Sequence, residues 1–286
     1  MFEGPNSPYI VPFDGSFRLA AASTIPATDD QDEIRKRRGR ARRELNKLQR
    51  LLSAGNRHAV LLVFQAMDAA GKDSTIRAVM RGVDPSGCEV TTFKRPSELE
   101  LDHDFLWRSA RRLPQRGQIG IFNRSYYEEV LVVRVHPELL QSQKLPSIAS
   151  PEKLWQDRFR SILDHEAHLA RNGTAILKFW LNVSKAEQRR RLLARLDNPD
   201  KNWKFEAGDI AERRHWDEYM HAYEQALNAT SRPWAPWYAI PADDKEYMQA
   251  RVGNIIVNAL TSIGLAYPEP TDEDRAIFDA ARQELN

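Results

Sequence analysis

The sequence predicts an α/β fold, in which a doubly wound parallel sheet of about five strands lies between layers of helices. Continuous apolar runs are typical of strands that are buried on both faces of such a sheet. Four of these runs lie at residues 58–64, 89–93, 118–122 and 175–181, and a weaker one lies near residues 237–240. Helical patterns separate the runs, and this alternation of strands with helices favours parallel pairing of the strands.

Helices are expected where apolar residues recur at helical intervals between the strands. Residues 29–53 are rich in helix formers and predict a long charged helix that ends at the Ala-Gly-Asn sequence of residues 54–56. The other expected helices cover residues 72–83, 101–112, 151–171, 185–196, 211–230 and 245–260. Residues 1–28 have no hydrophobic period and predict an irregular extension.

Bulk properties exclude several classes of protein. A chain of 286 residues can bury a large core without disulfides or a structural metal. Its single cysteine, Cys88, cannot form an internal disulfide, no Cys/His cluster has zinc-ligand spacing, and we expect the thiol to be buried in the core. Residues 1–17 lack the pattern of a signal peptide, and no apolar run approaches the roughly 20 residues of a membrane helix. These observations predict a cytoplasmic protein without membrane contact.

Charge is balanced overall but unevenly distributed. The chain has 42 basic and 40 acidic residues, a net charge of +2, so total charge indicates no particular partner. However, seven of the nine residues at 35–43 are Lys or Arg. Such a run can bind a polyanion, or it can be the solvated face of a charged helix. Charge alone favours the solvated face.

The first apolar run leads directly into a loop that resembles a phosphate-binding loop. The usual pattern is Gly, four residues, Gly-Lys, and then Ser or Thr. Gly71 and Lys72 match this pattern, whereas Ala66 stands at the first Gly and Asp73 stands at the Ser or Thr. The required context of strand, loop and helix is nevertheless present. The alternative is a turn that needs small residues only for packing.

The chemistry of this loop favours phosphate binding. The small residues Ala69, Ala70 and Gly71 let backbone N–H groups converge at a helix N-terminus, which favours an anion. Lys72 supplies a point charge for a phosphoryl oxygen, and Ser74 lies in the first helical turn as a further phosphate-binding candidate. The carboxylates of Asp68 and Asp73 would repel phosphate unless a cation lay between them. They therefore predict a Mg²⁺ ion held by one or both carboxylates.

A second cluster of polar residues follows the third apolar run. Asn123 is expected at the tip of this strand, where the carboxyl ends of parallel strands line a ligand crevice. Arg124 follows it and is placed to stabilise charge on a phosphoryl group during transfer. Glu128 is a candidate for positioning the acceptor or the metal. The alternatives are a surface arginine on a loop and an ordinary glutamate on a helix surface.

Residues 185–214 predict a basic lid. This segment contains nine Lys or Arg, and a loop at residues 198–202 divides it into two helical parts. Arg191 and Arg195 are four residues apart and therefore share one helical face. A mobile lid that closes on phosphates would have this composition. Six acidic residues are interleaved, so a solvated charged hairpin is the alternative.

Three segments together resemble the polyphosphate kinase 2 family over about residues 30–265. They are residues 67–73, 122–127 and 196–204, and they occur in the order and at the spacing typical of the family. The resemblance implies a three-layer αβα P-loop kinase fold like that of thymidylate kinase, with a helical lid. It also implies Mg²⁺-dependent transfer of phosphoryl groups between inorganic polyphosphate and nucleotides, with AMP, ADP and ATP as partners.

The same resemblance implies roles for individual residues. Positions tied to catalysis match Asp68, Lys72, Arg124, Arg191 and Arg195, and Glu128 is a further catalytic candidate. Further phosphate- or nucleotide-binding positions are assigned to Lys94, Arg108, Arg134, Arg195 and Lys204, and Arg108 and Arg134 are expected along the polyphosphate path. Residues 126–136 resemble the third class of the family, which accepts both AMP and ADP, so Glu128 is the expected determinant of substrate range.

These expectations divide the chain into three parts. Residues 1–54 form an N-terminal extension and basic helix, residues 55–265 form a P-loop kinase core with its lid at about 184–215, and residues 266–286 form a C-terminal helical tail. The resemblance suggests a polyphosphate track on the basic run at 35–43, and a homo-oligomer, a dimer or tetramer. One alternative is an ATP-dependent nucleotide or nucleoside kinase. The other is a non-catalytic polyanion- or nucleic-acid-binding protein, which the small net charge disfavours.

Overall fold

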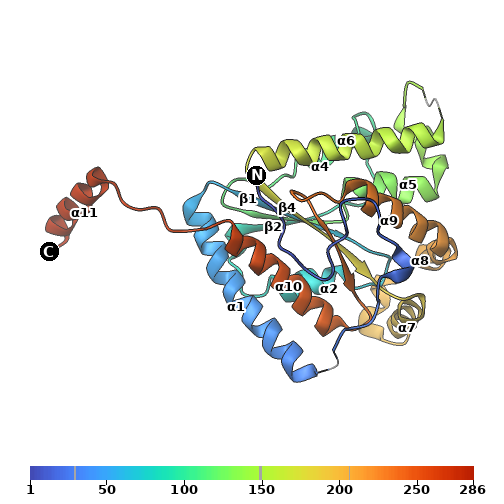
Figure 1. Cartoon of the computed structure of the whole chain (residues 1–286), viewed down its shortest axis with the longest axis horizontal. Coiled ribbons are helices and arrows are strands. Elements are labelled where there is room, and N and C mark those ends of the chain that lie inside the picture. The colour runs from blue at the N-terminus through green and yellow to red at the C-terminus, as the bar shows by residue number, and fades with distance from the viewer. Residues whose placement is uncertain (29, 148–149, 206) are drawn as a thin grey trace.

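A five-stranded parallel sheet forms the centre of the computed structural model, which describes residues 1–28, 30–147, 150–205 and 207–286 (Figure 1). The strand order is β2-β3-β1-β4-β5, and every neighbouring pair is parallel. The strands are β1 (Ala59–Gln65), β2 (Cys88–Thr92), β3 (Ile119–Asn123), β4 (Thr174–Asn182) and β5 (Trp237–Pro241). The predicted fold class is confirmed, and each strand lies within two residues of its predicted position.

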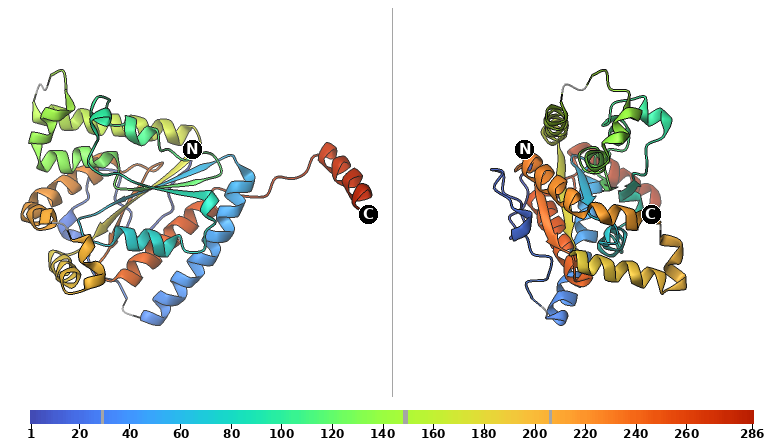
Figure 2. Two further views of the ribbon diagram at one scale, coloured as in Figure 1. Left: turned by 180° about the vertical axis from the view of Figure 1, so that it is seen from behind. Right: turned by 90° about the vertical axis from the view of Figure 1, so that its right-hand side faces the viewer.

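Helices cover both faces of the sheet (Figure 2). On one face lie α1 (Gln31–Gly55), α2 (Lys72–Val79) and α10 (Lys245–Ser262), which contact one another. On the other face lie α6 (Pro151–Arg171) and α9 (Trp216–Thr230). The remaining helices are α3 (Glu98–Leu101), α4 (Trp107–Ala110), α5 (Val132–Val135), α7 (Lys185–Leu196), α8 (Ala207–Glu212) and α11 (Asp272–Leu285). Short 3-10 segments join them, including η3 (Tyr126–Val130), η5 (Pro199–Lys204) and η6 (Arg213–His215).

Three predicted helices have different extents in the structure. The helix expected at 72–83 ends at Val79. The helix expected at 101–112 is replaced by α3 and α4, because a capping box at Ser97 starts α3 early and the Asp104 carboxylate caps Leu106 in the turn between them. The helix expected at 211–230 is divided into α8, η6 and α9. Helical periodicity alone did not locate these breaks.

The edge strand β2 differs from the other strands in its burial. All residues of β1, β3 and β5 are buried, whereas β2 is largely exposed. The prediction that its apolar run is buried on both faces is therefore wrong. The prediction for Cys88 is also wrong, because this residue opens β2 at the sheet edge and is only partly buried. Its partial burial raises the pKa of the thiol, which disfavours the reactive thiolate.

The N-terminal extension protects the opposite edge of the sheet. The Val11 amide donates to the Trp237 carbonyl at 2.9 Å, and the Ala239 amide donates to the Tyr9 carbonyl at 2.8 Å. Val11 is fully buried, so this segment is part of the packed structure. It shields the free backbone groups of β5, which would otherwise be open to pairing with another chain.

The C-terminal helix α11 stands away from the rest of the molecule at the end of an extended segment (Figures 1 and 2). None of its residues is buried. Among the helices of the described residues, none has the length and apolar character that crossing a membrane requires.

Candidate active site

The loop between β1 and α2 closes tightly around the N-terminus of α2. Ala69 and Gly71 both have left-handed backbone conformations, with φ angles of 61° and 109°. A Cβ on Gly71 would lie 3.2 Å from Ser74 Oγ and 3.3 Å from Met248 Cε, so both conformation and space favour glycine here. The backbone therefore turns into α2 as a phosphate-binding loop requires.

The Lys72 side chain is buried at this turn. Its Nζ donates to the Ala66 carbonyl at 2.7 Å. Burial is the main cause that lowers the pKa of Lys72, and the nearby Arg124 adds to it. An ammonium group has three donors, and Lys72 lines the cleft described below. Its charge is therefore placed to bind a phosphoryl oxygen.

The two aspartates of the loop contact the second predicted motif. Asn123, at the end of β3, donates from Nδ2 to Asp73 Oδ1 at 2.7 Å. Arg124 donates from Nη2 to Asp68 Oδ1 at 2.8 Å. The structure thus brings together four residues that the sequence predicted from segments about 50 positions apart.

Arg124 is held between two carboxylates. Besides Asp68, it pairs with Glu128 at 3.4 Å, and Glu128 is the first cause of the raised pKa of Arg124. Its φ angle is 63°, an uncommon conformation for a residue with a Cβ. The Arg124 amide donates to the Phe64 carbonyl at 3.1 Å, which fixes this backbone to β1. Such strain is common in residues that a site holds in place.

A cleft of about 850 Å³ is lined by Asp68, Lys72, Asp73, Asn123 and Arg124. Among the described residues, nine cationic side chains and two acidic side chains contribute to its wall. The acidic residues are Asp68 and Asp73, and the cationic residues are Lys72, Arg77, Lys94, Arg95, Arg124, Arg190, Arg191, Arg195 and Lys245. A ligand with several negative charges fits this excess of positive charge.

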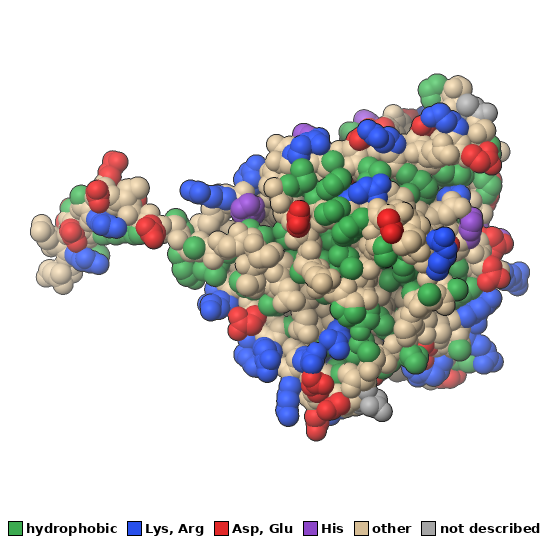
Figure 3. Space-filling model, viewed as in Figure 1, with side chains coloured by type: hydrophobic (Ala, Val, Ile, Leu, Met, Phe, Trp, Pro, Cys, Tyr) green, Lys and Arg blue, Asp and Glu red, His purple; other side chains and the backbone are tan. Residues whose placement is uncertain are grey.

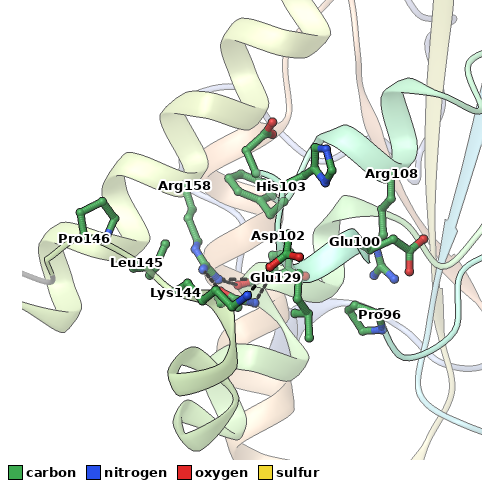
Figure 4. A pocket seen from close by; sticks show the side chains of 14 residues that line it. Pro96, Glu100, Asp102, His103, Arg108, Glu129, Lys144, Leu145, Pro146 and Arg158 are labelled. Atoms are coloured by element: carbon green, nitrogen blue, oxygen red, sulfur yellow. Dashed lines mark hydrogen bonds and ion pairs between the residues drawn. The ribbon is translucent and has the colours of Figure 1, made fainter. Parts of the chain in front are cut away.

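Smaller cavities lie beyond the cleft. One of about 360 Å³ shares Lys94 and Arg124 with the cleft and is also lined by Glu128 and apolar side chains. A further cavity of about 340 Å³ shares Arg108 and Glu129 with the first (Figure 4). Figure 4 shows Arg158 of α6 pointing toward Glu129, whose backbone carbonyl accepts from Arg158 Nη1 at 2.7 Å. The cleft therefore continues into a partly apolar space.

The structure places the two arginines expected along the polyphosphate path differently. Arg108 donates from Nη1 to the Lys94 carbonyl at 2.8 Å and lines both smaller cavities. Arg134 lies over the Trp155 ring at 5.6 Å and lines neither the cleft nor these cavities. Its Nη1 is buried and has no hydrogen-bond partner within the described part of the chain. Arg108 is therefore close to the site, and Arg134 is not brought to it.

The predicted lid arginines, Arg191 and Arg195, form hydrogen bonds and an ion pair with other residues of the protein. Arg191 donates from Nη1 to the Ala70 carbonyl at 2.5 Å and from Nη2 to the Ala242 carbonyl at 2.6 Å. It thereby fastens α7 to the phosphate-binding loop. Arg195 pairs with Asp209 of α8 at 3.1 Å. The Lys204 side chain lies outside the part of the chain that the structure describes.

A buried charge network supports the second motif and was missed by sequence analysis. Lys178 Nζ donates to Glu166 Oε2 at 2.6 Å, and Glu166 Oε1 accepts from the hydroxyls of Tyr126 and Tyr127, each at 2.9 Å. All four side chains are fully buried. The network joins α6 and β4 to the turn that carries Arg124. Its one signal in the sequence is a lysine within the apolar run at 175–181.

Replacing Glu166 with glutamine is expected to lower the free energy of unfolding by about 3–5 kcal/mol, because the Lys178 charge stays buried without its partner. Denaturant unfolding measures this change. The matched control combines Glu166→Gln with Lys178→Met, which keeps an acceptor for the two tyrosine hydroxyls, and should lose less stability because no buried charge remains. A single variant as stable as the wild type would contradict the expectation.

A phosphate-binding loop at the carboxyl edge of a parallel sheet, facing a basic cleft, defines a phosphotransferase of the P-loop kinase class. Residues 28–265 match the family model described as polyphosphate kinase 2 (PPK2), and the chain belongs to this family.

Relatives and a solved structure agree with this assignment. An ADP-polyphosphate phosphotransferase of Rhodopseudomonas palustris is 56% identical over 242 residues, 84% of each chain. An AMP/ADP-polyphosphate phosphotransferase of Meiothermus ruber is 50% identical over 228 residues, 80% of this chain and 81% of the relative. The crystal structure of polyphosphate kinase 2 from Arthrobacter aurescens TC1 superimposes with a TM-score of 0.87 at 38% identity, covering 99% of this chain and 98% of that one.

Proposed function

We propose that the protein transfers phosphoryl groups between inorganic polyphosphate and AMP or ADP, forming ADP and ATP. The observation that carries this proposal is the basic cleft built around Lys72, Asp68 and Arg124, in a chain of the polyphosphate kinase 2 family. The relatives named for ADP and for AMP/ADP are both similar to this chain. The likeness of residues 126–136 to the third class favours acceptance of both nucleotides.

The two substrates are assigned to adjoining spaces. Polyphosphate occupies the cleft of about 850 Å³, where cationic side chains outnumber carboxylates. The nucleoside occupies the cavity of about 360 Å³, whose apolar lining includes Phe93, Leu101 and Val133. Arg124 lines both spaces, so the donor and acceptor phosphates meet beside its guanidinium.

The reaction then requires alignment and neutralisation of charge. A phosphate oxygen of the nucleotide forms a bond to the terminal phosphorus of polyphosphate. The bond from that phosphorus to the bridging oxygen breaks, and the shortened chain leaves with the electron pair. Lys72 and Arg124 stabilise negative charge on the phosphoryl group, and Asp68 orients the attacking oxygen. Glu128 holds Arg124 and faces the acceptor cavity.

The residues of the cleft fit a Mg²⁺ ion. Asp68 and Asp73 supply carboxylate oxygens on the same wall, and Mg²⁺ commonly binds one or two carboxylates together with substrate phosphates and water. No cluster of three or more His, Cys, Asp or Glu suited to a metal occurs among the described residues. When bound, Mg²⁺ would neutralise phosphate charge and favour a compact arrangement of donor and acceptor.

Removal of divalent cations with EDTA is expected to abolish turnover, and added Mg²⁺ should restore it, because the cleft carboxylates otherwise repel the phosphates. Asp73→Asn should raise the Mg²⁺ concentration needed for half-maximal rate and weaken Mg²⁺ binding measured by calorimetry with polyphosphate present. Glu138→Gln, an exposed change outside the cleft, is the control. Full turnover without divalent cations would contradict the assignment.

The proposed function is tested by an assay without ATP. Purified protein is incubated with polyphosphate and AMP, ADP, GMP or GDP separately, and new di- and triphosphates are measured. Formation of ADP and ATP from AMP supports the proposal, and the guanine nucleotides report base preference. If only ATP serves as donor, the protein is instead an ATP-dependent nucleotide or nucleoside kinase.

The proposal also covers the oligomeric state and the cellular location of the protein. We infer a cytoplasmic homo-oligomer, a dimer or tetramer, that has no nucleic acid partner. Light scattering on purified protein reports the oligomeric state, and cell fractionation reports the location.

A further inference from the structure

The solvent-facing side of α1 carries a row of five cationic side chains. The residues are Lys36, Arg40, Arg43, Lys47 and Arg50, and all five are exposed. Their spacing of alternately four and three residues keeps them within an arc of about 80° and spreads them over about 21 Å of helix. Figure 3 shows Lys and Arg side chains along the edge of the molecule that α1 occupies in Figure 1.

Three other arginines of α1 pair with carboxylates, whereas these five cations form no such ion pair in the part of the chain that the structure describes. Arg35 and Arg38 pair with Glu246 at 3.3 Å and 3.0 Å, and Arg37 pairs with Glu33. Within the described ranges, none of the five cations of the row forms an ion pair with a carboxylate. The predicted run at 35–43 therefore contains three paired arginines, of which Arg35 and Arg38 reach α10, and Arg42, whose Nε is buried without a hydrogen-bond partner among the described residues. Its other three cations belong to the row, which extends beyond the run to Arg50.

The N-terminal end of α1, where the row starts, contacts residues on either side of Lys245. At the start of α1, Gln31 Nε2 donates to Asp244 Oδ2 at 3.2 Å, and Arg35 reaches Glu246. Lys245, between these two acidic residues, lines the cleft. A linear anion that leaves the cleft beside Lys245 thus meets the N-terminal end of α1.

We propose that this row binds the tail of long polyphosphate outside the cleft, an inference that rests on the proposed function. Each internal unit of polyphosphate carries a negative charge, so a chain longer than the cleft brings many charges into solvent. Binding to unpaired cations releases counterions and is favourable at low salt. Short chains end within the cleft and do not reach the row. The row therefore affects the affinity for long chains and leaves the chemical step unchanged.

The test compares a quadruple variant, Lys36→Ala, Arg40→Ala, Arg43→Ala and Lys47→Ala, with the wild type on long polyphosphate and on tripolyphosphate. The KM for the long chain is expected to rise on the order of tenfold, and its dependence on salt should weaken. The KM for tripolyphosphate and both kcat values should stay within about twofold. Fluorescence anisotropy of labelled long polyphosphate measures the loss of binding without turnover.

The matched control removes four exposed cations elsewhere, by Lys153→Ala, Arg160→Ala, Arg171→Ala and Arg275→Ala. The inference is overturned if this control raises the long-chain KM as much as the row variant does. It is also overturned if the row variant keeps the wild-type KM and affinity for long polyphosphate. The same holds if anisotropy with a labelled oligonucleotide falls in the variant while polyphosphate binding is unchanged. Anisotropy measures polyphosphate binding even if the wild-type protein shows no polyphosphate-dependent turnover. A wrong assignment of the row can therefore be distinguished from a wrong proposed function.

Discussion

Asp68→Asn is expected to lower kcat by about 100- to 10,000-fold while the protein keeps its fold. The Asp68 carboxylate lines the cleft and accepts from Arg124 Nη2 at 2.8 Å. Asparagine has nearly the same shape but no charge. It therefore cannot balance Arg124, bind Mg²⁺ strongly or draw a proton from an attacking phosphate. Steady-state kinetics with AMP and ADP, each at saturating polyphosphate, measure the loss.

Stability should change little in this variant. The ion pair between Asp68 and Arg124 is partly exposed, and exposed pairs contribute about 0–1 kcal/mol. The control is Asp164→Asn, which removes the same charge from an exposed pair with Arg160 on α6. It should leave both kcat and the thermal midpoint unchanged. Turnover near the wild-type value in Asp68→Asn would remove this residue from the mechanism.

The parts of the site that could be predicted are those that a short segment specifies. A strand followed by several small residues and a lysine predicts a tight turn into a helix. Gly71 and Lys72 could therefore be placed at the start of α2 from their neighbours in the sequence alone. Asn123 and Arg124 could be placed because the carboxyl ends of parallel strands meet at one edge. Their contacts with Asp73 and Asp68 follow from the adjacency of β1 and β3.

The parts that could not be predicted depend on contacts between distant segments. Arg191 is basic and lies in a basic segment, yet its guanidinium binds backbone carbonyls of the phosphate-binding loop and of residues after β5. The N-terminal extension has no hydrophobic period, yet its backbone bonds to β5 and its Val11 side chain is buried in the core. Glu166 is one of several glutamates along the sequence, and only the fold brings it to Lys178. In each case the partner is a tertiary neighbour that local pattern does not reveal.

Lys72→Met is expected to lower kcat/KM for polyphosphate by about 100- to 1,000-fold, because one charge that stabilises the transferred phosphoryl group is lost. Methionine is about as long as the buried methylene chain of lysine. Since burial lowers the pKa of Lys72, the folded protein disfavours its charge, and an apolar replacement should keep or raise the thermal midpoint. The variant therefore separates catalysis from folding.

The direction of this pKa shift also predicts the dependence on pH. The protonated ammonium binds phosphate, so its contribution is present at low pH and lost as pH rises through the pKa of Lys72. Because that pKa is lowered from 10.5, kcat/KM should fall earlier on the alkaline side than an ordinary lysine would dictate. Bound phosphate opposes the loss, so kcat should decline at higher pH than kcat/KM does. The control Lys153→Met, an exposed change on α6, should retain the wild-type pH profile. If Lys72→Met also retained it, the fall in kcat/KM at high pH would be caused by another group.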